Sequence, residues 1–400
     1  MRVTIAPFDL NLRHLRAVGA IVQRGSMSAA ANAVSLSQPA LTQGIAKLEA
    51  QLGVALFARG PGGMDPTEAG RALAERVAAA FAHLAGGVRT GRRFASPEWL
   101  MTATQMRAFL SLADAGSFVG AGTATGLSQP AIHRAVRDLE QVCGVALVDR
   151  RGRGIALSPA GLRLARGIRL ARAEIAGGIA EITDREGGSV VIGAMPLSRA
   201  MLVPRAIAQT VAAAPHVAIH VIEGSWRELA EALRDGAIDL MIGALRPKPG
   251  PPDMVQTPLL TDRLVIVGRA GHPLAGVAAP TPEQLAGFPW VVSHAGAPLR
   301  ALWERMFGDG PLPRAPVQCG SVMVIRGILV ESDFLTLLSP QQVALEVDSG
   351  VLAAIGPEPE VSGRVIGVTT RRDWRPTRAQ TRFLEALAGA ATSRESVRAE

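Results

Sequence analysis

The sequence predicts two halves of different fold class, an α-rich N-terminal half and a C-terminal α/β half. Three observations support this division. Residues 1–187 contain an internal repeat at a spacing of 91 residues, and apolar runs that alternate with helical segments begin only after it. Residues 1–187 also hold 22 Lys and Arg against 14 Asp and Glu, whereas residues 188–400 hold 20 of each. All of the excess positive charge therefore lies in the N-terminal half, as expected of a half that meets a polyanion.

The N-terminal half is a tandem duplication without gaps, running from about residue 10 to 87 and again from 101 to 178. The motif Ser37-Gln38-Pro39-Ala40 returns as Ser128-Gln129-Pro130-Ala131. The same shift superposes Gly25-Ser26 on Gly116-Ser117, Leu48-Glu49 on Leu139-Glu140, Gly53–Leu56 on Gly144–Leu147, and Ala69-Gly70 on Ala160-Gly161. Chance similarity between alanine-rich helices would not keep one register over this length.

Each copy has the pattern of three helices followed by a two-stranded wing. A first helix (Leu12 to Gln23; Thr104 to Ala113) ends at a Gly-Ser pair, whose serine caps a short second helix. The serine of each Ser-Gln-Pro-Ala motif caps a third helix, and the proline stands where its missing N–H costs little. A basic or glycine-rich turn then leads into a return segment. We therefore predict two winged helix-turn-helix domains, residues 8–66 and 101–157, each with a helix suited to the major groove.

Both copies resemble the N-terminal domain of LysR-type transcription regulators, in which Ser-Gln-Pro-Ala opens the recognition helix and Leu-Glu…Leu-Gly-Val leads into the wing. The resemblance implies double-stranded DNA as a partner. It assigns DNA contacts to Ser37, Gln38, Pro39, Thr42 and Arg59 in the first copy, and to Ser128, Gln129, Pro130, His133, Arg134, Arg150 and Arg153 in the second. Glutamine can pair with adenine through two hydrogen bonds, and a wing arginine can meet phosphate or enter the minor groove.

An alternative is that one copy is a degenerate relic. Gly120 and Gly122, in the second helix of the second copy, would each cost about 1 kcal/mol of helix stability. The first copy has Gln43-Gly44 in its recognition helix and a nearly uncharged wing at Gly60–Gly63. The second copy is the more basic of the two and the stronger candidate for DNA binding. Binding by both copies is the preferred interpretation.

A long helix is predicted after each wing, within residues 67–100, which also hold a basic connector, and within 158–186. In the family that the sequence resembles, this helix pairs antiparallel with its counterpart in a dimer. The duplication includes the helix, and 20 residues of helix span about 30 Å, so the two copies can pair within one chain as a pseudo-dimer of DNA-binding units. Pairing between chains through the second helix alone is the alternative. A homo-oligomer is expected in either case.

The C-terminal half, residues 187–390, is predicted to be an α/β domain with a parallel sheet, followed by a tail at 391–400. The segments SVVIGAMPLS and ESDFLTLLSPQQV resemble the effector-binding domain of LysR-type regulators, which has two lobes like a periplasmic binding protein. The resemblance is strongest to the galactose-binding-protein regulator subgroup. It implies a lobe I at 187–267 and 350–390 and a lobe II at 268–349.

Two lobes form a cleft, and clefts between lobes are where small molecules usually bind. We expect six residues at its edges to contact a ligand: Leu197, Ser198, Ser225, His294, Ala295 and Ser321. The loop before the helix that begins near Ser198 suits an anion, because helix N-termini present N–H groups. The expected effector is a small molecule such as a carboxylate or a sugar-related metabolite. For each serine, a plain helix cap is an equally valid interpretation.

Other classes of protein fit the sequence less well. It has no nucleophile elbow, P-loop or dinucleotide-binding motif, and its seven histidines form no metal-ligand pattern, so we expect no catalysis, cofactor or metal. A signal segment and membrane-length apolar runs are absent, which favours a cytoplasmic protein without membrane contact. Cys143 and Cys319 are expected to be reduced thiols. The preferred function is a ligand-gated transcription regulator, with RNA polymerase as a further partner. The alternative is a sequence-indifferent architectural DNA-binding protein.

Overall fold

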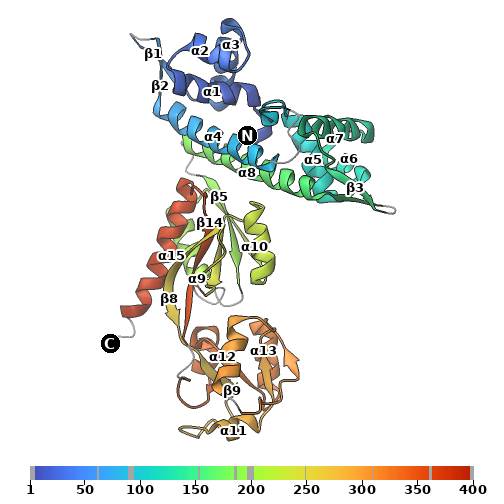
Figure 1. Ribbon diagram of the computed structural model, residues 1–400. Helices are drawn as coiled ribbons and strands as arrows, with labels where there is room; N and C mark the ends of the chain where they lie inside the picture. The colour runs from blue at the N-terminus through green and yellow to red at the C-terminus, as the bar shows by residue number, and fades with distance from the viewer. Residues whose placement is uncertain are drawn as a thin grey trace. The chain divides into compact units, whose positions relative to one another are not determined.

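The computed structural model describes residues 5–60, 63–88, 94–151, 154–183, 187–195, 202–247, 249–308, 310–359 and 363–396. The chain divides into two compact units, residues 1–188 together with 234–237, and residues 189–233 together with 238–400. Figure 1 shows a helical first unit, drawn in blue to green, and two sheets with their helices in the second. This order confirms the predicted fold class. Among the described residues, no helix is long and apolar enough to cross a membrane.

The N-terminal unit contains the predicted pair of winged helix-turn-helix domains. The first copy consists of η1 (Pro7–Asp9), α1 (Leu12–Arg24), α2 (Met27–Ala33), α3 (Gln38–Leu52), β1 (Phe57–Gly60), β2 (Gly63–Pro66) and the long helix α4 (Glu68–Gly87). The second consists of η2 (Pro97–Trp99), α5 (Ala103–Ala115), α6 (Phe118–Thr125), α7 (Gln129–Cys143), β3 (Val148–Arg151), β4 (Gly154–Leu157) and the long helix α8 (Pro159–Ile182). The wing strands β1 and β2 pair antiparallel, as do β3 and β4.

The repeated Leu-Glu pair attaches each wing to its recognition helix. Glu49 Oε1 accepts hydrogen bonds from the backbone N–H groups of Leu56 (2.7 Å) and Phe57 (3.1 Å). In the second copy Glu140 Oε1 accepts one from Leu147 (2.9 Å). Hydrogen bonds to an ionised acceptor are roughly twice as strong as neutral ones. The glutamate therefore holds the start of the wing against the end of the recognition helix in both copies.

The turn from wing to long helix is repeated in the same detail. Thr67 Oγ1 and Ser158 Oγ cap the first turns of α4 and α8 by accepting hydrogen bonds from the N–H groups of Gly70 (3.1 Å) and Gly161 (3.0 Å). At both glycines the helix passes very close to the wing. An added Cβ atom would lie 2.1 Å from the carbonyl oxygen of Leu56 in the first copy and 2.0 Å from that of Leu147 in the second, the residues just before the wing strands. Only glycine fits there without a shift of the backbone, which explains the Ala-Gly pair in each copy.

The long helices α4 and α8 pack against each other within the chain (Figure 1). Gly87 in α4 lies against Leu164 in α8, and near the other end Gly178 in α8 lies against Leu73 and Arg76 in α4. The helices are antiparallel, because the end of each one meets the beginning of the other. The buried residues of the two copies form one continuous hydrophobic core. The pairing thus joins the two winged domains into one body.

The short segment that precedes each copy packs against the other copy. η1 packs against α5 and α8 of the second copy, where Asp9 forms an ion pair with Arg107 at 3.1 Å. η2 packs against α4 of the first copy, and the guanidinium of Arg16 lies 4.7 Å from the centre of the Trp99 ring. Arg16 and Arg107 are 91 residues apart, so the exchange follows the same repeat as the folds themselves.

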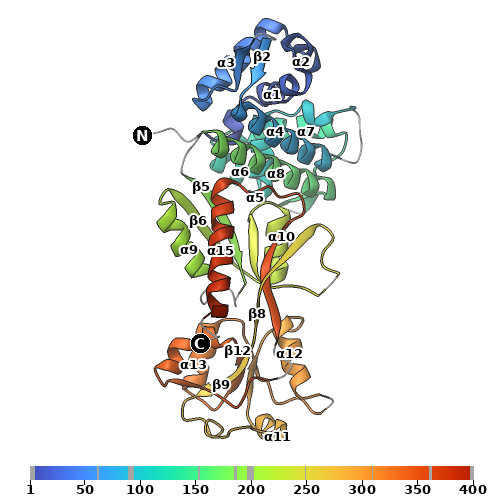
Figure 2. The same ribbon diagram turned by 90° about the vertical axis from the view of Figure 1, so that its left-hand side faces the viewer.

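Lobe I of the C-terminal unit is a five-stranded sheet in the order β6-β5-β7-β14-β8, with helices on both faces. Its elements are β5 (Gly188–Ala194), α9 (Leu202–Ala213), β6 (Val217–Glu223), α10 (Trp226–Arg234), β7 (Leu240–Ala244), β8 (Met254–Asp262), β14 (Arg364–Arg371) and α15 (Arg378–Ser396). α9 and α15 pack on the face that carries Val190 and Ile192, and α10 packs on the face that carries Val191 and Met241 (Figure 2). Alternate residues of one strand therefore serve two cores.

Lobe II is a second five-stranded sheet, in the order β11-β10-β12-β9-β13. Its elements are β9 (Val265–Arg269), α11 (Pro282–Ala286), β10 (Trp290–Val292), α12 (Pro298–Met306), β11 (Val317–Gln318), α13 (Val322–Val330), β12 (Leu335–Leu338), η3 (Pro340–Gln342), α14 (Ala344–Asp348) and β13 (Leu352–Ala354). Trp290, Trp303 and Phe307 form an aromatic cluster on one side of this sheet, with ring centroids 5.7–6.0 Å apart. α13 packs on the opposite side.

The sheets differ from the sequence expectation in two respects. Pairing is parallel between β5 and β7 and between β10 and its neighbours, but β14 and β9 pair antiparallel, so both sheets are mixed. β14 runs against β7 because it brings the chain back from lobe II. In addition, β9 and β13 pair with each other in lobe II, so the chain changes lobes after residues 262 and 354 and not at 267 and 350. In both cases the paired strands, β14 with β7 and β13 with β9, are far apart in sequence, so the local apolar pattern does not predict their pairing.

We predict that Gly70→Ala destabilises the N-terminal unit by about 1–3 kcal/mol, because the new methyl group meets a backbone carbonyl that cannot rotate away. The matched control is Gly86→Ala in the same helix, where nothing lies within 4 Å of the added carbon. That change should stabilise the unit by up to about 1 kcal/mol. Hydrogen exchange of the α4 amides in the intact chain measures both effects. Equal behaviour of the two variants would show that the close approach to the wing is not limiting.

Candidate DNA-reading helices and effector cleft

The recognition helix of the first copy, α3, presents its first residues to solvent. All four contacts expected on this helix are exposed: Ser37, Gln38, Pro39 and Thr42. Ser37 Oγ accepts a hydrogen bond from the N–H of Ala40 at 3.4 Å, and Thr42 Oγ1 donates one to the carbonyl oxygen of Gln38 at 3.0 Å. Both hydroxyls are thus used in part by the helix itself. The side-chain amide of Gln38 has no such partner within the described part of the chain.

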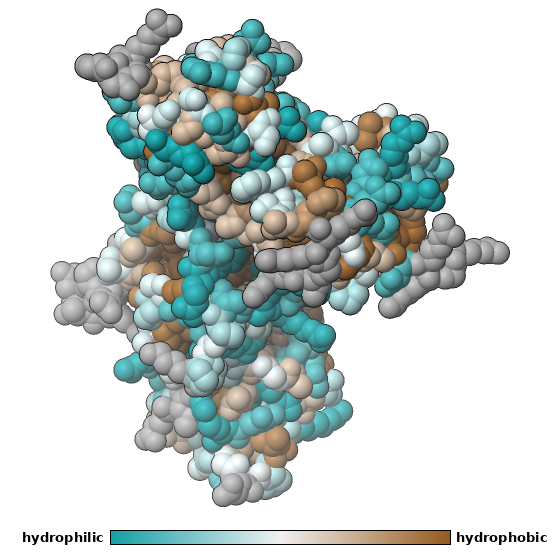
Figure 3. All heavy atoms as spheres, turned by 45° about the horizontal axis from the view of Figure 1, so that its top comes forward, coloured by the Kyte–Doolittle hydropathy of each residue, from teal (hydrophilic) through white to brown (hydrophobic). Residues whose placement is uncertain are grey.

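The recognition helix of the second copy, α7, is exposed in the same way and is more basic. All five contacts expected on this helix are exposed: Ser128, Gln129, Pro130, His133 and Arg134. The ring of His133 stacks on Phe118 of α6, with centroids 3.5 Å apart, so α6 orients it. Ser128 Oγ caps the helix as Ser37 does, by accepting from the N–H of Ala131 at 3.4 Å. Figure 3 shows hydrophilic side chains, in teal, over the part of this winged domain at the right of the view.

The wing arginines are placed only by their backbones. Arg59 lies in β1 opposite Met64, and Arg150 lies in β3 opposite Ile155. The two positions are equivalent, since the third residue of the first wing strand pairs with the second residue of the return strand in each copy. Arg153 lies outside the described residues.

The glycines that suggested a degenerate copy have a packing reason. Gly44 in α3 lies under the ring of His14, whose atoms would be 2.8 Å from an added Cβ. Gly120 and Gly122 in α6 are packed so closely that added Cβ atoms would lie 3.0 Å from neighbouring atoms. Burial lowers the pKa of His14, as do the charges of nearby Lys47 and Arg13, so the packed ring is neutral. Both helices that contain these glycines, α3 and α6, are continuous.

The C-terminal unit has a cleft of about 400 Å³ between its two lobes. Strand ends and helix starts of lobe I form one wall, and the loop after β10 with the start of α13 forms the other. Its lining residues are Met195, Ser225, Trp226, Arg227, Ala244, Arg246, Ser293, His294, Ala295, Gly296, Ala297, Pro298, Leu299, Cys319, Gly320, Val322, Ile325, Leu338, Gln342 and Arg364. A volume of this size holds a small metabolite.

Three of the six expected ligand contacts line this cleft: Ser225, His294 and Ala295. Ser225 Oγ accepts a hydrogen bond from the N–H of Glu228 (3.4 Å), so Ser225 also caps α10. The hydroxyl and the N–H of Ser225 both donate to Glu228 Oε2, at 2.7 Å and 2.8 Å. These two bonds lower the pKa of Glu228, the backbone bond most. Ser321 is a helix cap whose Oγ accepts from the Val324 N–H at 3.5 Å. Its neighbours line the cleft, but Ser321 itself does not.

The other two expected contacts, Leu197 and Ser198, lie outside the described residues. Three arginines and a tryptophan also line the cleft: Arg227, Arg246, Arg364 and Trp226. The guanidinium of Arg246 lies 4.8 Å from the centre of the Trp226 ring, and its Nη1 donates to the carbonyl oxygen of Gly296 in lobe II at 3.5 Å. Burial lowers the pKa of Arg246. The arginine follows β7 by two residues, and ligands of α/β domains often bind beyond the carboxyl ends of strands.

Arg364 is the most deeply buried charge of the cleft, with a side chain 8 % exposed. Its Nε donates to Asp262 Oδ2 at 3.1 Å, while Asp262 Oδ1 accepts from the hydroxyl of Ser339 in lobe II at 2.8 Å. Nη2 lies 3.0 Å from Asp262 Oδ2 without the alignment of a hydrogen bond, and has no hydrogen-bond partner among the described residues. Burial lowers the pKa of Arg364 against the opposing effect of Asp262. The cleft thus contains a guanidinium with unused donor capacity.

The electrostatics of the cleft favour an anion. Its lining includes three arginines and, among the described residues, no Asp or Glu. Within the same part of the chain, no group of His, Cys, Asp and Glu is arranged to hold a metal ion. Cys319, a free thiol at the cleft wall, is partly exposed.

These features define a class of protein, a regulator with two winged helix-turn-helix domains and a two-lobed ligand-binding domain. Residues 12–71 and 103–162 each match the bacterial regulatory helix-turn-helix protein of the lysR family, and residues 183–392 match the LysR substrate binding domain. The chain therefore belongs to the LysR family of transcription regulators. The predicted membership of the LysR family and the duplicated helix-turn-helix are confirmed. The family is one of transcription regulators and not of enzymes.

Two relatives show how far the similarity extends. The chain is 33% identical to the HTH-type transcriptional regulator GalR of Pseudomonas putida over 367 residues, which cover 90% of this chain and 92% of that protein. It is 28% identical to the HTH-type transcriptional regulator GbpR of Azospirillum brasilense over 265 residues, or 62% of this chain and 76% of that protein. The first similarity covers nearly the full length of both proteins.

Two solved structures share the fold. A full-length OxyR from Pseudomonas aeruginosa has a TM-score of 0.55 at 24% identity, covering 73% of this chain and 94% of that one. Full-length LysG from Corynebacterium glutamicum, with the bound effector Arg, has a TM-score of 0.53 at 21% identity, covering 72% and 97%. At these identities the likeness concerns the fold alone.

We predict that Asp262→Ala destabilises the C-terminal unit by about 3–5 kcal/mol, because Arg364 is left buried without its carboxylate. The control is Glu358→Ala, which removes the partner of the exposed Arg263 and should cost at most about 1 kcal/mol. Urea unfolding followed by tryptophan fluorescence measures both, since four of the five tryptophans lie in this unit. Equal midpoints for the two variants would mean that Arg364 does not depend on Asp262.

Proposed function

We propose that this regulator binds a defined operator through both winged domains, and that a small anionic effector in the cleft changes its affinity for DNA. The observation that carries the effector class is the presence of Arg246 and Arg364 in a cleft with no carboxylate in its described lining. Family membership supplies DNA and a small-molecule effector as partners. The proposal adds the charge of the effector and the number of DNA readers.

A carboxylate suits the two arginines best. Guanidinium groups bind carboxylates through charge-assisted and often bidentate hydrogen bonds, and these are stronger where water is excluded. Arg364 Nη2 has unused donor capacity, and Arg246 already reaches across to lobe II through Gly296. The hydroxyl and ring groups of Ser225 and His294 would orient the rest of the molecule, and Ala295 would shape its wall. The loop at Leu197 and Ser198 stays a predicted contact, at the expected start of a helix.

The effect on DNA binding follows from the position of the cleft between lobes. Asp262 connects Arg364 of lobe I to Ser339 of lobe II, so an anion that takes donors from Arg364 acts on a contact that holds the lobes together. A ligand changes DNA affinity only if it binds one arrangement of the protein better than another. Movement of the lobes supplies such a difference.

Both winged domains are proposed to read DNA. The exposed start of each recognition helix supports base contacts by Gln38 and Gln129. His133 and Arg134 would contact DNA beside Gln129, and the wing arginines would contact the phosphate backbone of the DNA. The packing of α4 on α8 supports a pseudo-dimer, in which one chain supplies both readers. We further propose a cytoplasmic homo-oligomer that contacts RNA polymerase from its operator.

The alternative is an architectural protein that binds DNA of any sequence. A nuclease footprint of the full chain upstream of its own gene, at fixed moderate salt, separates the two functions. A discrete protected segment with two half-sites supports the proposed regulator. Uniform, salt-sensitive coverage without a preferred segment supports the architectural alternative and rejects the proposal.

We predict that Gln38→Ala and Gln129→Ala each weaken binding to the footprinted operator by about 1–3 kcal/mol, while binding to a scrambled duplex changes little. The matched controls are Gln51→Ala and Gln141→Ala, exposed glutamines at the far ends of the same helices. Fluorescence anisotropy at one salt concentration measures all four. Loss in only one copy would reduce the protein to a single reader, and loss in neither would contradict base reading by these residues.

We predict that simple carboxylates raise the melting temperature of the protein, whereas their uncharged amides do not. Arg246→Gln should weaken binding of the best carboxylate by about 1.5–3 kcal/mol, the range for a hydrogen bond to a charged group. Arg263→Gln, which removes an exposed arginine outside the cleft, should leave it unchanged. Thermal shift with a panel of acids, amides and neutral sugars measures this. Binding of neutral sugars in preference to acids would overturn the proposed effector class.

A further inference from the structure

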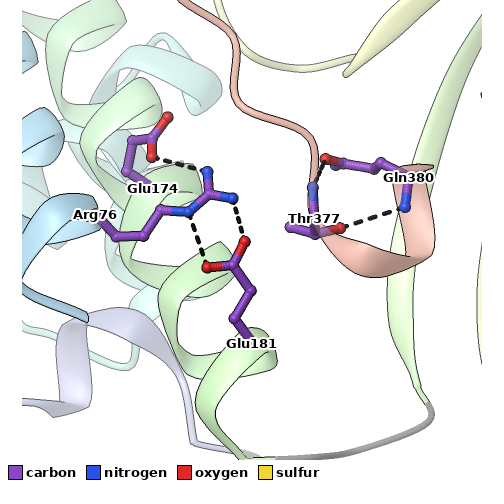
Figure 4. A network of polar contacts seen from close by, with 5 residues as sticks. All are labelled: Arg76, Glu174, Glu181, Thr377 and Gln380. Atoms are coloured by element: carbon purple, nitrogen blue, oxygen red, sulfur yellow. Dashed lines mark hydrogen bonds and ion pairs between the residues drawn. The ribbon is translucent and has the colours of Figure 1, made fainter. Parts of the chain in front are cut away.

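The interface between α4 and α8 contains a buried ion cluster (Figure 4). Arg76 of α4 donates from Nη1 to Glu174 Oε2 at 3.1 Å, from Nε to Glu181 Oε2 at 3.3 Å, and from Nη2 to Glu181 Oε1. The side chains of Arg76 and Glu174 are 7 % and 9 % exposed. Burial alone would lower the pKa of Arg76, but its hydrogen bonds to Glu181 and Glu174 outweigh this and raise it. Arg76 therefore stays a cation, although it lies inside the interface.

The two ends of the helix pair differ, although the copies are repeats. The counterpart of Arg76, 91 residues later, is Gly167, and the counterpart of Glu174, 91 residues earlier, is His83. At this second end the backbones approach so closely that a Cβ on Gly167 would lie 2.6 Å from the carbonyl oxygen of His83. An ion cluster at one end thus corresponds to a close glycine contact at the other. The interface fits α4 to α8, and it would not fit either helix to a copy of itself.

Pairing of like helices from two chains would lose both features. In the same register, an α8–α8 pair places Gly167 opposite Glu174 at both ends, so two buried carboxylates lack the guanidinium. An α4–α4 pair places Arg76 opposite His83 at both ends, without the carboxylates and without the close glycine contact. Removing one partner of a buried ion pair is strongly destabilising, because the remaining charge cannot return to water.

We propose that Arg76, Glu174 and Glu181 select α8, and not a second α4, as the partner of α4, so that the pairing of α4 with α8 within one chain closes the long-helix surface to like helices of a second copy. The selection is a form of specificity in which the wrong pairs are excluded by uncompensated charge. It rests on the proposed function only in treating the joined domains as a pair of readers. The test measures pairing without DNA, so its failure is separate from failure of the footprint.

Cysteine cross-linking of the full chain tests which helices pair. The contacts of Gly87 with Leu164 and of Arg76 with Glu174 set a register that places Ala80 opposite Ala171. These alanines are fully buried and 91 residues apart, so each would face itself in a pair of like helices. The background carries Cys143→Ala and Cys319→Ala. Ala80→Cys with Ala171→Cys should form a disulfide within one chain under mild oxidation, and each single variant should form no covalent dimer. Covalent dimers of the Ala171→Cys protein, or no intrachain disulfide in the double variant, would overturn the proposal.

Charge variants in the double-cysteine protein test the cluster itself. Arg76→Glu should slow the intrachain disulfide about tenfold or more, since each tenfold corresponds to about 1.4 kcal/mol and loss of a buried partner exceeds this. Adding Glu174→Arg and Glu181→Arg should restore the rate. Arg71→Glu, an exposed arginine on the same helix, should change it less than about twofold. Arg76→Gln, which keeps the polar side chain, serves if the reversed charge prevents folding, and circular dichroism reports folding. An unchanged rate in Arg76→Glu or Arg76→Gln would show that the cluster does not select the partner.

Discussion

The packing of α4 against α8 is the contact on which the N-terminal unit depends. A winged domain of about 60 residues buries a smaller fraction of its surface on folding than a larger domain does, and is marginally stable alone. Here Leu73, Leu84, Leu164 and Ile175 from the long helices are nearly inaccessible to water, and they belong to the same core as the residues of both winged domains. The exchanged segments η1 and η2 add contacts of the same kind, each supporting the copy that it does not precede. The two winged domains are therefore one cooperative structure and not two independently folded domains.

The repeat makes most of this unit predictable from the sequence, because each repeated motif corresponds to one local contact. The serines of Ser-Gln-Pro-Ala cap the recognition helices, and the glutamates of Leu-Glu hold the start of each wing. The glycines of Ala-Gly allow each long helix to lie close to the segment that precedes the wing. These contacts involve residues close in sequence, so pattern and spacing are enough to find them. Gly44 and Gly120 were harder to interpret, because the reason for each lies in a neighbouring helix, and sequence propensity alone made them look like defects.

The cleft was less predictable for the same physical reason. Ser225 and Ser321 stand at helix starts, where capping and ligand contact have one sequence signature, and the structure gives a cap to both and a place in the cleft lining only to Ser225. Arg364 could not be identified, because β14 reaches the cleft only by returning from the other lobe to pair between β7 and β8. The mixed sheets and the shifted lobe border have this origin as well. Pairing between segments a hundred residues apart leaves little trace in local apolar periodicity.

The covalent link between the two winged domains makes their pairing independent of protein concentration. Two winged domains on separate chains meet by a second-order reaction, and dilution separates them. Within one polypeptide the same contact between α4 and α8 closes in a first-order step, at an effective concentration that the connector sets and the cell does not. A regulator built this way keeps its winged domains paired when only a few molecules are present. The number of paired winged domains is then proportional to the number of chains, whereas in a protein that pairs between chains at low concentration it would rise with the square of that number.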